Sequence, residues 1–356
     1  PSAACGPAPR ACIFSWEVAD FGRRAANIRF FRELARQAAD QSDVVRLEVG
    51  AHAADAYLTV LAAREQVRVT SADVARWQGL AAVVHALVAQ QLRPGADDSR
   101  AQAELAAARI RASAAQRDLE QAQGSLTEAL GLPPGAPLPP LAPLPASALP
   151  AAPPPPLSAP PQARVHVDAV AAATAHQQEI ARSALPRFYA LGTAFGRGSG
   201  VLAAGKFATG AAGLTPDTAA NWAVGLSVDF SFTRWFANRA QKTEAAAQLK
   251  YQQEQQRAGG NALALARARA TADWNEARTV AQESPIGLAA AQAGEAQARV
   301  RYQTGLASLV DWANSEQLLL QADSDNALSQ LQLWRALVEA AFASGSLQPV
   351  LAAAGH

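Results

Sequence analysis

The feature that most constrains the fold is a long stretch without proline near the start of the chain. From residue 21 to residue 92, apolar side chains recur at helical spacings, and the next proline is Pro94. A single helix over that range would extend roughly 100 Å at 1.5 Å per residue. A helix of that length needs partner helices along it. Thr70 and Ser71 could cap a new helix and so divide it there.

Two short turns indicate that the helices form hairpins and that the hairpin is duplicated. Residues 301–314 read RYQTGLASLVDWAN, in which Gly305 can adopt the left-handed backbone that ends a helix and Ser308 can cap the next one. Residues 92–99 read LRPGADDS and place Gly95 between two alanine-rich runs in the same way. The sequence therefore predicts two helical hairpins, one in each of two internal repeats.

The repeats define the predicted domains. The first repeat spans 1–131 and the second 163–345, with a proline-rich linker at 132–162 and a tail at 346–356. The first repeat is expected to hold a strand, a long helix, a tip and a helix, at 11–20, 21–92, 93–99 and 99–130. The second is expected to hold a helix, two strands, a long helix, a tip and a helix, at 163–184, 185–197, 221–232, 235–303, 304–308 and 308–344.

Three segments should depart from regular structure. Residues 1–10 are rich in proline and alanine and are expected to be irregular. Gly259, Gly260 and Pro285 should kink or break the second long helix. The tail should be loose.

Strict alternation marks the strand at 221–232. Its apolar side chains alternate with small or polar ones, and a soluble sandwich strand would show the same pattern. A chain built mostly from helices, however, has too few strands to form the core that such a face would cover. A barrel strand with its apolar face toward lipid fits better. Aromatic side chains could anchor at the lipid interfaces, namely Trp16, Trp222, Tyr189 and Trp235, with ordinary packing as the alternative for Trp235. The predicted lipid-facing residues are Phe14, Trp16, Trp222, Val224, Leu226, Val228 and Phe230.

Composition and motifs exclude several function classes. The chain has 31 basic and 30 acidic side chains, so its charge gives no reason to expect nucleic-acid binding. It shows no paired acids, nucleophile elbow or phosphate loop, so we predict no enzyme, no cofactor and no metal site. Cys5 and Cys12 form no metal motif and could pair or stay free. The chain has no apolar run of about 18 residues, so no transmembrane helix is expected.

The order of strand, long helix, turn and helix, present twice, resembles the TolC-type outer-membrane efflux proteins. Three motifs support the resemblance: SWEVADFGRR at 15–24, LRPGADDSRA at 92–101 with the following AQAELAAAR, and Arg301–Tyr302 with Gly305, Ser308 and Asp311. They look like the family's strand-to-helix junction and its two periplasmic tips. The match covers residues 13 to 345.

The resemblance implies a mainly α fold with a small transmembrane β part. Long antiparallel helical hairpins would form a periplasmic α-barrel, and a homotrimer would share one β-barrel with four strands from each protomer. The implied function is a passive exit duct for tripartite efflux or type I secretion, in the outer membrane of a Gram-negative bacterium and extending into the periplasm. Implied partners are outer-membrane lipid, a periplasmic adaptor protein and an inner-membrane pump of the RND, ABC or MFS type.

The resemblance also indicates a difference and leaves an alternative. The family begins with a helix and a first barrel strand before the strand that holds Trp16, and this chain is expected to lack both. The alternative function is a periplasmic coiled-coil adaptor or a structural scaffold.

Roles at the tips follow from the same resemblance. Asp311 matches the first of two carboxylates that ring the family's aperture, and Asn314 stands at the second. The alternative is that Asp311 is only a first-turn acid favoured by the helix dipole. The predicted aperture is Tyr302, Asp311 and Asn314. The predicted adaptor-docking tip is Arg93, Gly95, Asp97, Asp98, Ser99, Gly305, Leu306 and Ser308.

Tyr302 matches a tyrosine that holds the family's tip closed by bonding to an acid of the first repeat. The position of that acid is Ala101 here, and the arginine that shares the acid is replaced by Ala307. The family's gate is therefore not expected in the same form. Asp97 or Asp98 could supply the acid, or both could be solvated turn acids.

Overall fold

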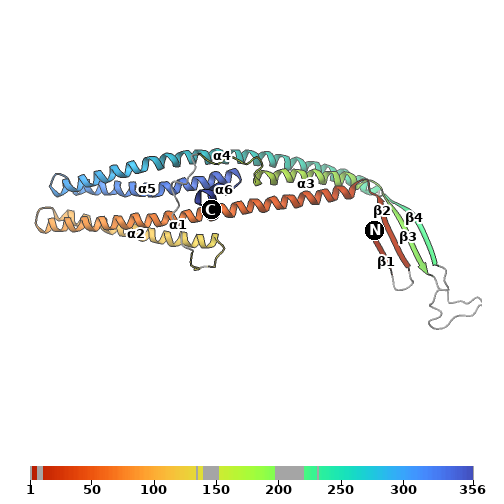
Figure 1. The fold of residues 1–356 in the computed structure, drawn as a ribbon, viewed down its shortest axis with the longest axis horizontal. Helices are drawn as coiled ribbons and strands as arrows, with labels where there is room; N and C mark the ends of the chain where they lie inside the picture. Colours follow the sequence, from red (N-terminus) through yellow and green to blue (C-terminus); the bar gives the residue numbers. More distant parts are fainter. Residues whose placement is uncertain are drawn as a thin grey trace, which may run out of the picture. The chain divides into compact units, whose positions relative to one another are not determined.

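The computed structural model describes residues 2–5, 11–133, 135–138, 152–196, 220–230 and 232–355. These residues form a mainly α-helical protein with one small antiparallel sheet, as predicted (Figure 1). The strands are β1 (Ser2–Cys5), β2 (Ala11–Ala19), β3 (Arg187–Gly196) and β4 (Ala220–Asp229). The helices are α1 (Arg23–Ala89), α2 (Gly95–Ala129), α3 (Pro161–Ser183), α4 (Phe232–Gln303), α5 (Leu309–Ser344) and α6 (Gln348–Ala354).

The chain divides into two compact units, and each unit draws on both halves of the sequence. Unit 1 comprises Pro1–Ala39 and Arg164–Ala258, and unit 2 comprises Asp40–Ala163 and Gly259–His356. The division of the chain into two repeats stays a prediction, because each unit contains segments from both.

The sheet of unit 1 has four strands in the order β1-β2-β3-β4. β1 pairs with β2 from Ser2 opposite Ser15 to Cys5 opposite Cys12. The expectations of an irregular start and of a missing barrel strand are therefore wrong for Ser2–Cys5. A strand of four residues is too short to show an alternating pattern. Cys12 is disulfide-bonded, and Cys5 is its Cα partner in the register.

The register of β2, β3 and β4 assigns the predicted lipid-facing side chains of β2 and β4 to one face, whereas Ile13 and Leu191 lie on the other. Trp16 lies opposite Ala190, and Ala190 lies opposite Leu226, so Trp16 and Leu226 share a face. All seven predicted lipid-facing side chains are exposed, and Leu226 is the most exposed at 86%. Tyr189 pairs with Ser227 and therefore lies on the opposite face. The prediction that Tyr189 sits at a lipid interface is not supported by this register.

Asp20 lies at the junction between β2 and α1 and stabilises the start of the helix. Its carboxylate accepts hydrogen bonds from the backbone N–H groups of Gly22 at 3.0 Å and Arg24 at 2.6 Å, so it caps α1. Arg182 of α3 donates to the carbonyl of Gly22 at 2.8 Å. Gly22 has φ +80, and an added Cβ would lie 3.0 Å from the Arg182 guanidinium. These bonds explain why the SWEVADFGRR motif forms the junction between β2 and α1.

In unit 2, α1, α2, α4 and α5 pack together at their tip ends (Figure 1). The buried residues there form the tip core: Trp77, Leu80, Ala81, Val84, Ala101, Leu105, Ala108, Tyr302, Leu309, Trp312 and Ala313. Large apolar side chains from all four helices meet in this cluster, so burial holds the two hairpins together.

Several predicted interruptions are absent. Helix α1 continues through Thr70, whose hydroxyl bonds to the carbonyl of Gln66 at 2.8 Å inside the helix. Helix α4 contains Gly260 and Pro285 without a break, because the packing of a long helix can offset the loss of one backbone hydrogen bond. The tail is not loose, since α6 forms and Val350 packs beside a second buried cluster that includes Trp334. None of the described helices is both long and apolar enough to cross a bilayer.

Candidate functional site: the hairpin tips

The first tip turns at Gln91 rather than at Gly95. Gln91 has φ +60, and the N–H of Leu92 bonds back to the carbonyl of Leu87 at 2.9 Å, which closes the end of α1. Pro94 is the N-cap of α2, and Gly95 is the first residue of that helix. The prediction that Gly95 supplies the left-handed turn is therefore wrong. Gln91, which is not a glycine, adopts the left-handed conformation instead.

The second tip turns at Gly305, as predicted. Gly305 has φ +81, and the N–H of Leu306 bonds to the carbonyl of Arg301 at 2.7 Å. Ser308 caps α5 through a reciprocal capping box with Asp311. The N–H of Asp311 donates to Ser308 Oγ at 3.2 Å, and the N–H of Ser308 donates to Asp311 Oδ2 at 3.0 Å.

These bonds define the electrostatics of Asp311. The Ser308 side chain first, and then the Ser308 backbone N–H, hold the pKa of Asp311 below its ordinary value. The carboxyl group is thus ionised near neutral pH and exposed to solvent. The helix-start role of Asp311 is present in the structure. Its role at an aperture stays a prediction.

Arg93, Asp97 and Tyr302 form a contact between the two tips that we call the tip latch. The Tyr302 hydroxyl donates a hydrogen bond to Asp97 Oδ2 at 3.0 Å. The Arg93 guanidinium lies 4.3 Å from the centre of the Tyr302 ring and also donates to the Tyr302 backbone carbonyl. Asp97 precedes Ala101 by about one helical turn. Asp97 therefore provides the carboxylate that accepts the Tyr302 hydrogen bond, which Ala101, at the position of the family's acid, cannot provide.

Burial strengthens the tip latch. Tyr302 is fully buried, and its ring lies 5.4 Å from that of Trp312. Loss of solvation first, and then the bond to Asp97, raise the pKa of Tyr302 to about 12. The phenol therefore keeps its proton and acts as a donor at every physiological pH.

The other predicted tip residues differ in their surroundings. Asp98 Oδ1 lies 3.4 Å from His85 Nδ1. Ser99, Leu306 and Asn314 are exposed, and Leu306 is 73% exposed. The sequence did not single out Gln91, Trp312 or His85, which also build the tips. The sequence did contain a signal for the burial of Trp312, because Trp312 lies three residues after Leu309 and therefore on the same, buried face of the helix.

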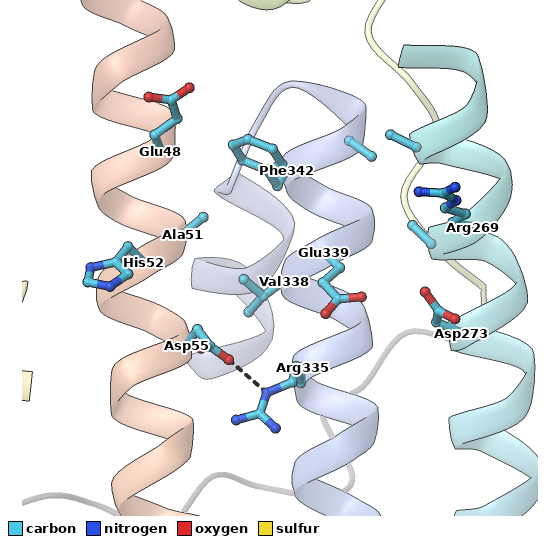
Figure 2. Close-up of a pocket in the computed structure, with 13 residues that line it drawn as sticks. Glu48, Ala51, His52, Asp55, Arg269, Asp273, Arg335, Val338, Glu339 and Phe342 are labelled. Carbon is cyan, nitrogen blue, oxygen red and sulfur yellow. Dashed lines mark hydrogen bonds and ion pairs between the residues drawn. The ribbon is translucent and has the colours of Figure 1, made fainter. Parts of the chain in front are cut away.

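A groove of about 500 Å³ lies farther from the tips, between α1, α4 and α5 of unit 2 (Figure 2). Asp55 and Arg335 form an ion pair at 2.7 Å across it. Burial first, and then repulsion by Asp273, raise the pKa of Glu339. Most of its charged side chains are exposed, and the described residues hold no group of His, Cys, Asp or Glu that could bind a metal ion. We assign it no chemistry.

Comparison with known proteins gives a consistent result. Residues 12–132 match the family model described as outer membrane efflux protein. A search of curated protein sequences finds no significant match. Three solved structures share the fold, although sequence identities below 20% limit the likeness to the fold alone.

These three structures are channels or outer-membrane proteins by their descriptions. The outer-membrane channel OprN gives a TM-score of 0.80 at 19% identity, covering 97% of this chain and 79% of that one. The outer membrane protein VceC from Vibrio cholerae gives 0.80 at 16% identity, covering 94% and 79%. CusC, described for its transmembrane channel formation, gives 0.82 at 16% identity, covering 97% and 81%.

Proposed function

We propose that this chain belongs to the outer membrane efflux protein family, whose model matches its residues 12–132, and that it is the exit duct of a tripartite efflux or type I secretion system. Export through it would be passive. A periplasmic adaptor and an inner-membrane pump of the RND, ABC or MFS type would supply the substrate and the energy.

The single observation that best supports the duct is the apolar face of the sheet. Trp16, Val224 and Leu226 lie on one face by register and are more than half exposed. Large apolar side chains presented together in this way need a lipid or protein partner. On the other face of β4, Ser227 and Gly225 alternate with its apolar residues, which is the pattern of a lumen-facing strand.

The sheet also explains why we propose a homotrimer. β1 and β4 are its edges, and the described residues provide no further strand to pair with either. A β-sheet in lipid must close so that no edge is left unpaired. Three copies of a four-stranded sheet would close a barrel of about twelve strands, within the size range of outer-membrane barrels.

The tips would form the mouth that faces the pump. Leu92 and Leu306 are exposed at 64% and 73%, one at each tip, and would offer apolar contacts to an adaptor hairpin. Asp311 would place one carboxylate per protomer near the threefold axis. Such a ring concentrates cations in a narrow mouth.

Reconstitution tests the proposal. The protein, extracted in detergent, should be a trimer by multi-angle light scattering and should conduct ions in planar bilayers. The alternative, a periplasmic scaffold or adaptor, predicts a protein that stays soluble without detergent and does not conduct. A folded monomer without conductance would refute the duct.

A further inference from the structure

The C-terminal end of α5 is buried, so its backbone carbonyls are shielded from bulk water. Ala341, Ala343 and Ser344 are each at most 5% exposed. The last four carbonyls of a helix have no partner within the helix, and a buried carbonyl without a hydrogen bond destabilises the fold. Donors from other parts of the chain must therefore bond to this end of α5.

Two of these donors come from the proline-rich segment that leads into α3. The backbone N–H of Leu157 donates to the carbonyl of Ser344 at 3.1 Å. The side-chain amide of Gln162, in the first turn of α3, donates to the carbonyl of Phe342 at 3.0 Å. We call residues 153–162 the strap. Because the strap is bonded to α5 at both Leu157 and Gln162, the part between them lies along the end of that helix.

The other donors come from α4 and from the residues that follow α5. Arg267 of α4 donates from Nε to the carbonyl of Ala343 at 3.1 Å. The N–H groups of Gly345 and Ser346 bond back to the carbonyl of Ala341, each at 3.1 Å. All of the last four carbonyls of α5 are thus hydrogen-bonded, and the strap supplies donors to two of them.

The strap passes so close to the end of α5 that only glycine fits at residue 345. Gly345 has φ +96, which glycine adopts without strain. A Cβ added at Gly345 would lie 2.5 Å from Pro160 Cβ and 3.2 Å from Pro161 Cδ. Both prolines are buried, although residues 155–159 before them are exposed. Gly345 therefore meets two separate requirements, a left-handed backbone and the close contact with the strap.

Apolar packing between α4 and α5 is slight beneath the strap. The buried cluster there consists of Ala270, Ala340 and Ala343. Three methyl groups bury far less apolar area than the tryptophan and leucine side chains of the tip core. Pro153 and Pro154 line a cavity of about 110 Å³ together with the same alanines. The hydrogen bonds of the strap therefore supply attachment that the packing of small side chains does not.

We propose that the strap is a conformational anchor, which holds the C-terminal end of α5 against α4 and makes this end the fixed end of the second hairpin. Residues 153–156 are four consecutive prolines, which restrict the strap to extended conformations even when it is not bound. This inference concerns unit 2 alone. It rests on the proposed function only for its consequence, that a duct opening at its tips would move the Gly305 end of the hairpin while the anchored end stays in place.

Hydrogen exchange resolved to single residues tests the anchor on the full chain. The Leu157 amide should exchange on the order of a hundredfold more slowly than in an unstructured chain, because it is bonded to Ser344. Gly345→Ala should lower the protection of Leu157 and of the last turn of α5 by about tenfold or more, because the added Cβ collides with Pro160 and the backbone is left-handed. Residues 301–313 at the tip should keep the protection of the unmodified protein.

Gly355→Ala is the matched control for backbone strain. Gly355 also has a left-handed backbone, with φ +91 at the end of α6, but a Cβ added there would meet nothing within 4 Å. This variant should carry similar local strain and leave the protection of Leu157 unchanged.

Gln162→Ala is a milder variant that deletes one bond of the strap. It should lower the protection of Leu157 and of the last turn of α5 by roughly threefold to tenfold, the effect of one hydrogen bond. If Gly345→Ala does not fold, the result for Gln162→Ala decides.

Three outcomes would refute the anchor. The first is a Leu157 amide that exchanges in the unmodified protein as fast as in an unstructured chain. The second is a Gly355→Ala variant that lowers the protection of Leu157 as much as Gly345→Ala does. The third is a Gln162→Ala variant with unchanged protection at Leu157 and at the last turn of α5. None of these measurements needs ion conduction, so a failure to conduct in bilayers would refute the duct and leave the anchor untouched.

Discussion

Tyr302 and Asp97 are 205 positions apart in the sequence, yet the tyrosine hydroxyl and the aspartate carboxylate are joined by a 3.0 Å hydrogen bond. Asp97 lies in the first turn of α2, where the helix dipole favours an acid. Tyr302 lies at the end of α4, in the other hairpin. One polar bond therefore ties the two tips of unit 2, and its neighbours can be tested separately.

The bond between Tyr302 and Asp97 should have a measurable coupling energy. Tyr302→Phe and Asp97→Asn should each weaken tip protection in hydrogen exchange, because each removes or weakens a bond to a charged acceptor. A double-mutant cycle should give a coupling of roughly 1–2 kcal/mol. Arg100→Ala, at an exposed position on α2, is the control and should have no effect. A coupling near zero would mean that the bond does not hold the tips together.

The two glycines of the tips should respond oppositely to a methyl group. Gly305→Ala should destabilise its turn by roughly 1 kcal/mol, because Gly305 has φ +81. Gly95→Ala should be neutral or slightly stabilising, because Gly95 is helical and an added Cβ would meet nothing within 4 Å. Local hydrogen exchange at each turn gives the comparison.

Gln91 offers the converse test of the same backbone geometry. Gln91→Gly should stabilise the first turn by up to about 1 kcal/mol, because glycine adopts φ +60 without strain. Lower protection of the first turn in this variant would show that a contact of the Gln91 side chain stabilises the turn by more than its backbone strain destabilises it.

Arginine at Leu226 and at Ser227 should have unequal effects. These neighbours point to opposite faces of β4, and the Leu226 face is the one proposed to contact lipid. Arginine there should cost roughly 2–4 kcal/mol in bilayer stability, whereas arginine at Ser227 should cost little. Urea unfolding of the protein in lipid vesicles measures both. Equal losses would contradict the assignment of the two faces.

Asp311 should control ion selectivity if it lies at the mouth. Asp311→Asn should lower the preference for cations in planar bilayers without loss of the trimer, because it removes one carboxylate per protomer. In the unmodified protein the preference should persist as pH falls to about the ordinary value of 3.8. It should disappear below it, since the pKa of Asp311 is lowered.

Ser308→Ala separates the two roles of Asp311. This change removes the side-chain half of the capping box and should destabilise the start of α5 by roughly 1 kcal/mol. It should leave selectivity unchanged, because the carboxylate remains. If Asp311→Asn also leaves selectivity unchanged, Asp311 acts only in the cap and the aperture lies elsewhere.

The sequence predicted those features that depend on local chemistry. Alternation along residues 222–228 gave the exposed face of β4, and the order of Gly305, Ser308 and Asp311 gave the second tip and its cap. Both follow from neighbouring residues and need no knowledge of the rest of the chain.

The features that the sequence missed depend on partners distant in the chain. The first tip turns at Gln91, which carries no local signal for a left-handed backbone. Glu295 and Glu316 look like solvated charges on alanine-rich helices, and only the packing of α1 against α4 and α5 buries them. Asp97 could be assigned to Tyr302 only once the two hairpins were placed side by side.

The short β1 strand has a consequence for how copies of the chain can assemble. Among the residues that the structure describes, β1 pairs with β2 only from Cys12 to Ser15, and no strand pairs with that side of β2 from Trp16 onward or with the outer edge of β4. Two open edges on one chain form a head-to-tail contact that can repeat. If the rotation between copies closes after three, the result is a ring, and if it does not, the same contact grows into a filament. Assembly in lipid at low protein density would then favour the ring.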